Sequence, residues 1–418
     1  MTVKEHGPFT SWRWLAALGL GVACGPAPAP LVAPLPAVRV RPGVEVLLTD
    51  SARLVRNVAV GLVTNQGGLD AAGVHAVDRL LAARVRLVAL FSPEHGFRGA
   101  AAPGAAVAHS VDSATGLPIY SLYGATRGPT DAMLAGIEAL LVDLPDVGAR
   151  YYTYLGTTIE VMRSAKRRGI PVIVLDRPNP IGGAVQGNVL DPAFRSFVGS
   201  LAMPMRPGMT LGELARLANR ELSLGAALTV VPADGWSRGH SLLEIGLPFV
   251  PPSPNLKDLE SLFHYPGTCL FEGTALSVGR GTEASFRQIG APWLDPERVL
   301  AVLPRPRLPG VSFRAVRFTP LQPGDGKYSG VTVRGIRLVL TDERRYDPTL
   351  TAVALLAAIR QVHPDSLGFR NSSFDRLAGG SGLREAILAG QDPFAIVASW
   401  RAARERWLTE REFSLLYR

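Results

Sequence analysis

Apolar runs and amphipathic segments alternate along the first half of the chain. The apolar runs, which predict buried strands, span residues 58–64, 87–91, 117–122, 139–144 and 171–175. The amphipathic segments, which suit helices, span residues 74–84, 129–136 and 157–168, and Gly169 follows the last one as a helix stop. Because strands that are apolar on both faces are typical of parallel sheets, this alternation predicts a parallel sheet covered by helices.

The pattern changes after about residue 262. Residues 311–318 and 331–340 alternate apolar and polar positions and predict strands of a mixed sheet, whereas 350–362 and 395–408 have helical periodicity. A chain of 418 residues is long enough for two domains. We therefore expect one α/β domain over residues 39–262 and a smaller α/β domain over 263–418, divided near the proline-rich turn at 251–254. Before that turn, Thr210 and Glu213 have capping-box spacing and predict a helix that runs to Asn219.

Composition excludes some classes of function. The net charge of +9 is carried mostly by arginine, and no basic run is interleaved with aromatic residues, so nucleic-acid binding has no support. The sequence holds no Walker loop, no nucleophile elbow, no dinucleotide fingerprint and no paired metal-ligand histidines, so we expect neither a cofactor nor a metal.

The first 38 residues have the composition of an export signal followed by a linker. Lys4 and Arg13 precede an apolar stretch at 14–23 that is too short to span a membrane. Cys24 follows at the position of a lipoprotein cysteine, although Gly21 occupies a slot where such signals usually carry a larger apolar residue. We therefore expect export to the periplasm, the cell envelope or the medium, with membrane attachment through a lipidated Cys24 as one outcome and an ordinary cleaved signal as the other. The proline-rich residues 25–36 suit a stiff spacer.

Polar side chains gather where the predicted strands end. Pro93 ends the second strand, and Glu94 and His95 follow it at once. Since ligands bind at the carboxyl ends of parallel strands, these ends predict one functional rim. The other residues that we assign to it are Asn65, Gln66, Asp143, Asp146, Arg150, Tyr152, Tyr154, Asp176, Arg177 and Asn179.

The rim suits cleavage of a glycosidic bond, which needs an acid for the leaving oxygen and usually a second carboxylate. We expect Glu94 to be the acid, and His95 either orients it or forms a structural hydrogen bond from the loop to the backbone. The carboxylate partner of Glu94 stays open among the catalytic candidates Asp143, Asp146 and Asp176. Tyrosines 152 and 154 either contact a sugar ring or pack in the core. From the second half, Glu272 and Arg280 lie in glycine-rich loops that can approach a ligand.

Seven motifs occur in a fixed order along the chain. They are GLVTNQ at 61–66, SPEHGFRG at 92–99, DVGARYYTY at 146–154, LDRPNP at 175–180, VPPSPN at 250–255, YPGT at 265–268 and GAPW at 290–293. From residue 44 onward this series resembles the NamZ-type exo-β-N-acetylmuramidase family. The resemblance implies a Rossmann-like first domain, a smaller second domain and an active-site cleft between them. It also implies release of N-acetylmuramic acid from the non-reducing end of peptidoglycan fragments, with Glu94 as the leading catalytic residue and with Ser253 and Asn255 at the substrate.

Two stretches depart from the family pattern. Pro207 stands where the family commonly has histidine, and Ser285, Phe286 and Arg287 stand where it usually has proline, phenylalanine and an acidic residue. Two alternatives therefore remain beside the muramidase: a protein that binds cell-wall sugars without cleaving them, and a hydrolase of another β-glycoside. Candidate partners for the lactyl carboxylate of muramic acid are Arg98, Arg150, Arg177 and Arg280. Retention or inversion at the anomeric carbon stays open.

Overall fold

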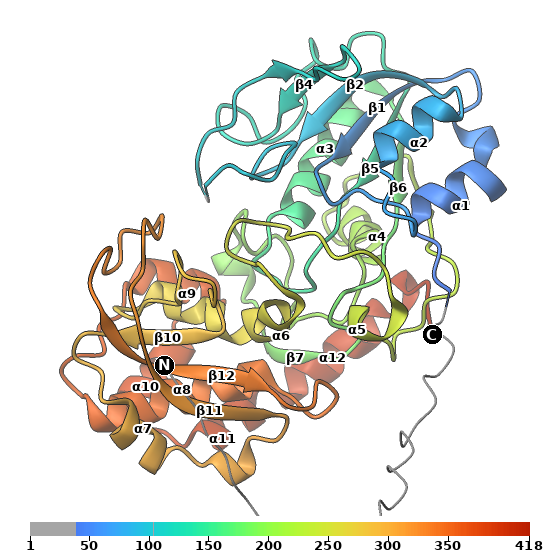
Figure 1. The fold of residues 1–418 in the computed structure, drawn as a ribbon. Coiled ribbons are helices and arrows are strands. Elements are labelled where there is room, and N and C mark those ends of the chain that lie inside the picture. Colours follow the sequence, from blue (N-terminus) through green and yellow to red (C-terminus); the bar gives the residue numbers. More distant parts are fainter. Residues whose placement is uncertain (1–38, 103) are drawn as a thin grey trace, which may run out of the picture. The chain divides into compact units, whose positions relative to one another are not determined.

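The computed structural model describes residues 39–102 and 104–418, which fall within one compact unit (Figure 1). The expected signal, the proline-rich spacer and Cys24 lie outside the described residues. Within the described ranges, no helix combines the length and the apolar character needed to cross a membrane.

A seven-stranded sheet forms the core of the first half. Its strands are β1 (Ala59–Thr64), β2 (Arg86–Ser92), β3 (Ser110–Val111), β4 (Pro118–Ser121), β5 (Ala139–Asp143), β6 (Val172–Leu175) and β9 (Leu228–Val231). The order across the sheet is β3-β4-β2-β1-β5-β6-β9, and every pair except β3 with β4 is parallel. Without the antiparallel edge strand β3, this is the doubly wound Rossmann order, which reverses direction between β1 and β5.

Helices cover both faces of this sheet, because successive strand residues point to opposite sides. Val60 and Leu62 of β1 join one cluster of buried side chains, and Val63 joins another. The first cluster packs against α1 (Gly43–Asp50) and α2 (Ala76–Ala82), and the second against α3 (Tyr154–Arg168) and α4 (Leu211–Glu221) (Figure 1). The predicted parallel sheet covered by helices is therefore confirmed.

The second half is built on a three-stranded antiparallel sheet. Its order is β10 (Gln288–Ala291), β12 (Val333–Leu340), β11 (Val311–Phe318), so the sheet that we expected to be mixed is antiparallel. Its main helices are α6 (Leu259–Thr268), α7 (Pro296–Val302), α8 (Pro348–Val362), α9 (Asn371–Ala378), α10 (Gly382–Leu388), α11 (Pro393–Ser399) and α12 (Arg401–Arg411). The short helix α5 (Leu242–Ile245) and the hairpin of β7 (Gln186–Val189) and β8 (Pro204–Arg206) connect the two halves. One buried cluster runs from Val63 to Trp407, so the halves share a core.

Two predicted helices differ from the structure. The predicted helix at 129–136 is instead a series of turns over 131–136. Gly128 precedes the segment, and Gly136, at φ 76°, ends it after a single i→i−4 hydrogen bond from Leu134. The helix expected at 395–408 is divided into α11 and α12 at Trp400. The capping box of Thr210 and Glu213 is present and opens α4.

Candidate active site

Glu94 and His95 lie in a pocket between the first and second halves of the described chain. The pocket spans about 560 Å³ of empty space, part of which is open to solvent. Its lining residues are Glu94, His95, Tyr151, Tyr152, Thr153, Val198, Ser253 and Leu256 from the first half and Tyr265, Cys269, Glu272, Arg280, Phe286 and Leu377 from the second. We call it the Glu94 pocket.

The loop after β2 fixes the direction of Glu94. His95 and Gly96 both have left-handed backbone conformations, with φ of 71° and 77°, so the chain turns sharply there. The two carboxylate oxygens of Glu94 have different donors: the Gly104 amide donates to Oε1 at 2.9 Å, and the Thr153 hydroxyl donates to Oε2 at 2.8 Å. Glu94 is therefore held at both oxygens while its side chain lines the pocket.

His95 is held in one tautomer by the same loop. Its Nδ1 lies 2.8 Å from the carbonyl oxygen of Ala101, and because a carbonyl only accepts, Nδ1 carries the proton. Burial lowers the pKa of His95 below its usual value, and the Arg280 guanidinium acts in the same direction. The neutral ring of His95 thus carries an unprotonated Nε2, and the residue lines the pocket.

Glu272 and Arg280 form the opposite wall. Arg280 Nε donates to Glu272 Oε1 at 2.5 Å, and its guanidinium lies 5.1 Å from the centre of the Phe286 ring. Burial opposes the charge of Arg280, but the Glu272 carboxylate outweighs it and raises the pKa of the guanidinium. Among the described residues that line this pocket, Glu272 is the other carboxylate beside Glu94.

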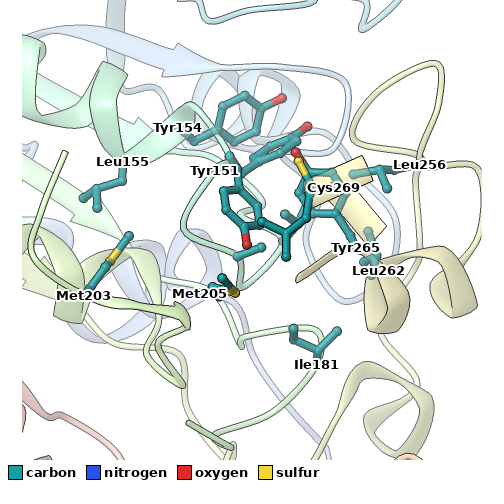
Figure 2. Packing of buried hydrophobic residues seen from close by; sticks show 14 of the residues in the cluster. Tyr151, Tyr154, Leu155, Ile181, Met203, Met205, Leu256, Leu262, Tyr265 and Cys269 are labelled. Atoms are coloured by element: carbon teal, nitrogen blue, oxygen red, sulfur yellow. The ribbon is translucent and has the colours of Figure 1, made fainter. Parts of the chain in front are cut away.

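Aromatic side chains close the floor of the pocket. Tyr151 donates to the carbonyl oxygen of Pro266 at 3.0 Å, and its ring meets that of Tyr265 edge to face (Figure 2). Cys269 lies beside Tyr265, and burial raises the pKa of its thiol well above the usual value. The floor is therefore uncharged and rigid.

The hydroxyls of Tyr152 and Tyr154 are both engaged in hydrogen bonds within the protein. The hydroxyl of Tyr152 donates to the carbonyl oxygen of Pro252 at 2.9 Å, and that of Tyr154 accepts from Asn65 Nδ2 at 2.5 Å. The two rings lie 4.6 Å apart. Tyr152 lines the Glu94 pocket, whereas Tyr154 and Asn65 fasten the structure behind it.

The structure does not bring the three aspartates to Glu94. Asp143 forms a buried ion pair with Arg177, whose Nε lies 2.5 Å from Oδ1. Asp176 accepts from Thr210 Oγ1 at 2.6 Å and from the Tyr417 hydroxyl at 2.7 Å, and burial raises its pKa to about 6. Both carboxylates therefore pair with other protein groups. Neither Asp143 nor Asp176 lines the Glu94 pocket.

Asp146 lines a different cavity, at the point between β1 and β5 where the sheet order reverses. This cavity encloses about 590 Å³ of empty space and has a mainly apolar lining that includes Leu247, Phe249 and Val250. Burial raises the pKa of Asp146 to about 7, against a hydrogen bond from the Gly148 amide. Arg177 lines the same cavity.

The remaining predicted residues are spread over several places. Arg98 pairs with Asp112 and is 72% exposed, and Arg150 donates to the carbonyl oxygens of Met203 and Leu377. The expected lactyl partners therefore separate, and Arg280 is the one that lines the Glu94 pocket. The other contacts are Gln66 to the Pro251 carbonyl, Asn179 to the Met209 carbonyl, Ser253 to the Leu256 amide and Asn255 to Ser285 at 3.5 Å.

The residues that depart from the family pattern do not line the Glu94 pocket. Ser285 donates to the carbonyl oxygen of Gly279 at 3.0 Å, and Arg287 forms ion pairs with Asp258 and Glu260. The carbonyl oxygen of Pro207 accepts from Arg411 at 3.0 Å. Phe286, which matches the family's phenylalanine, is the residue of this stretch that lines the pocket.

Sequence reasoning missed Tyr123 and Thr153. Burial and then the neighbouring Glu94 carboxylate raise the pKa of the Tyr123 phenol to about 12, which places it beside the acid. Tyr123 follows the end of β4, so the strand-end rule that found Glu94 applies to it as well. Thr153 lies within the DVGARYYTY motif, where the sequence indicated roles for the tyrosines and none for the threonine. Tyr265 opens the YPGT motif, but the sequence indicated no role for it, and no motif included Cys269.

Family models match both halves of the chain. Residues 60–260 match the N-terminal model of exo-β-N-acetylmuramidase NamZ, and residues 263–417 match its C-terminal model. The peptidoglycan β-N-acetylmuramidase NamZ of Bacillus subtilis is 40% identical over 382 residues, which cover 91% of this chain and 92% of that protein.

Crystal structures of two DUF1343-family proteins from Bacteroides fragilis have the same fold. The first has a TM-score of 0.84 and 32% identity, covering 92% of this chain and 100% of that one. The second has a TM-score of 0.75 and 32% identity, covering 91% of this chain and 99% of that one. With models matched over both halves and a curated relative matched over nearly its full length, the chain belongs to the NamZ family of exo-β-N-acetylmuramidases.

Proposed function

We propose that this protein is an exo-acting glycosidase that releases N-acetylmuramic acid from the non-reducing end of peptidoglycan fragments. The observation that carries the proposal is the position of Glu94. It lines a pocket between the two halves with both of its oxygens held, in a chain whose curated relative is named for this activity.

Glu94 acts as the acid of the reaction. Its proton passes to the glycosidic oxygen as the bond to the anomeric carbon breaks. Water supplies the hydroxyl of the released sugar, and the other proton of that water restores the acid form of Glu94. Thr153 and Gly104 hold the carboxyl group in place during this transfer. Glu272 is the carboxylate available to stabilise the positive charge that develops on the sugar, and Arg280 is the cation available to the lactyl carboxylate.

The test is hydrolysis of a β-N-acetylmuramide with a 4-nitrophenyl leaving group. We expect the wild type to release nitrophenol. Because nitrophenolate leaves without a proton, the role of Glu94 is tested on the disaccharide of N-acetylmuramic acid linked to N-acetylglucosamine, where we expect Glu94→Gln to lower kcat by about a thousandfold since its amide cannot protonate the leaving sugar oxygen. Glu405→Gln, at an exposed position on α12, is the matched control and should retain the wild-type rate.

Three outcomes contradict the proposal. Equal rates for Glu94→Gln and wild type remove Glu94 from the reaction. Binding of muramic acid without cleavage favours the sugar-binding alternative. Faster turnover of glucosaminides or glucosides than of muramides favours the other alternative, a hydrolase of another β-glycoside.

We also infer that the protein is exported. The support is the order of Lys4 and Arg13, the apolar residues 14–23 and Cys24, followed by a proline-rich spacer. Expression of the full chain in a Gram-negative host, followed by mass spectrometry of its N-terminus, tests this. Cleavage before a lipid-modified Cys24 supports an anchored enzyme, whereas cleavage elsewhere supports a periplasmic or secreted one. An uncleaved chain in the cytoplasm contradicts export.

A further inference from the structure

A second pocket continues from the Glu94 pocket. Four residues line both of them: Val198, Glu272, Arg280 and Leu377. The second pocket adds Gly324, Asp325, Ser373 and Arg376 and encloses about 720 Å³ of empty space. The two pockets therefore form one cleft, with the Glu272–Arg280 pair at their common boundary.

We propose that this second pocket is the subsite for the sugar unit that follows the terminal muramic acid, with Arg376 and Asp325 as its specificity-determining residues. The inference rests on the proposed function, and it identifies the part of the substrate that the enzyme leaves behind. An exo-acting enzyme must bind one terminal sugar and leave an open path for the rest of the glycan beyond it. The floor of the Glu94 pocket is closed by buried Tyr151, Tyr265 and Cys269, so the cleft continues toward Arg376 instead.

The lining of the second pocket suits a sugar. Arg376 and Ser373 lie exposed on α9 and offer hydrogen-bond donors, and Leu377 and Val198 offer apolar surface to a ring face. Asp325 also lines the pocket, and its Oδ2 is buried with no hydrogen-bond partner among the described residues. A hydroxyl or acetamido N–H of the second sugar can donate to this acceptor once the Asp325 side chain rotates to expose it.

The loop that carries Asp325 is fastened to the boundary of the two pockets. The Asp325 Oδ1 atom accepts from the Lys327 amide at 3.0 Å. The Lys327 ammonium is buried and donates to the carbonyl oxygens of Phe271, Glu272 and Leu276 at 3.2, 2.9 and 2.8 Å. The connection between β11 and β12 thus reaches across to the segment that presents Glu272, so Asp325 is held at a fixed place beside the boundary.

The experiment compares two substrates on one set of variants. One substrate is the nitrophenyl β-N-acetylmuramide, and the other is the disaccharide of N-acetylmuramic acid linked to N-acetylglucosamine. We expect Arg376→Ala and Asp325→Ala to lower the ratio of kcat/KM for the disaccharide to kcat/KM for the nitrophenyl glycoside by about tenfold, mainly through KM. The nitrophenyl ring takes the place of the second sugar but has no hydroxyl or acetamido group to bond with these two residues. Arg406→Ala, at an exposed arginine of α12, is the matched control and should keep the wild-type ratio.

An unchanged ratio in both variants overturns the subsite, and so does an equal loss on both substrates, which would place these residues at the first sugar. If the wild type cleaves neither substrate, the proposed function fails, and calorimetry with the same two sugars then decides the subsite. Tighter binding of the disaccharide than of the muramide, lost in Arg376→Ala, supports it, and equal binding of the two sugars overturns it. Circular dichroism confirms that each variant is folded.

Discussion

At the scale of single residues, the site depends on how Glu94 is held. Each of its oxygens has its own donor, and the two donors come from different parts of the chain: Gly104 from the loop after β2 and Thr153 from the start of α3. The carboxyl group cannot rotate without losing one of these bonds. Gly104 and Thr153 therefore help to determine where the transferable proton of Glu94 lies.

Replacing Thr153 by valine keeps the shape of the side chain and removes the hydroxyl that donates to Glu94. We expect kcat to fall about tenfold, the cost of one hydrogen bond to a charged group. Initial rates on the disaccharide of N-acetylmuramic acid linked to N-acetylglucosamine measure this. The matched control is Thr158→Val, because the Thr158 hydroxyl donates to the Tyr154 carbonyl within α3. Equal rates for Thr153→Val and Thr158→Val would show that Glu94 does not depend on this bond.

Asp146 predicts a pH dependence of stability. Its pKa is raised from the usual value to about 7, so the folded chain takes up a proton there as the pH falls through 7, whereas an unfolded chain does so only near pH 4. The stability that Asp146 contributes is therefore fully present below about pH 4 and lost as the pH rises through 7.

Asparagine imitates the protonated form of Asp146 at every pH. We expect Asp146→Asn to melt a few degrees above the wild type at pH 8 and at nearly the same temperature at pH 4. Thermal melts at both pH values measure the difference. The exposed Asp131→Asn is the control and should show no such trend. A constant difference in Tm between pH 4 and pH 8 contradicts the prediction.

At the scale of elements, the sequence predicted strands well and strand-end partners poorly. The ends of β1, β2, β5 and β6 fall within one or two residues of their predicted positions, because continuous apolar runs bounded by proline, glycine and polar residues determine them locally. Partner choice is not local. Asp143 pairs with Arg177 from the end of another strand, and Asp176 bonds to Tyr417, which lies 241 residues further along the chain. Periodicity carries no information about such contacts.

The connection between β11 and β12 acts through one buried cation. Lys327→Met removes three hydrogen bonds to carbonyl oxygens that present Glu272. We expect Tm to fall by several degrees and kcat/KM to fall with it, because the buried carbonyls are left without donors and Glu272 shifts relative to Arg280. Lys257→Met is the control, since Lys257 pairs with an exposed glutamate at the surface. An unchanged Tm in Lys327→Met would show that these hydrogen bonds do not stabilise the segment that carries Glu272.

At the scale of the whole molecule, the two halves behave as one cooperative structure. They share a buried cluster, and the C-terminal end bonds back to the first half: the Tyr417 hydroxyl donates to Asp176 and accepts from the Ala233 amide at 2.8 Å. We expect one calorimetric transition. Tyr417→Phe should move that whole transition down by a few degrees. Two resolved transitions, of which Tyr417→Phe shifts one, would contradict a shared core.

The return of the C-terminus also sets an order of events for a chain that is made from its N-terminus. Asp176 follows β6, and its partner Tyr417 lies 241 residues further along the chain. The Thr210 hydroxyl and the Gly212 amide can donate to Asp176 as soon as α4 forms, whereas its third donor is absent until residue 417 has been made. A nascent chain stalled before residue 417 therefore lacks one buried hydrogen bond at its first sheet, and the bond between Asp176 and Tyr417 is among the last native contacts to form.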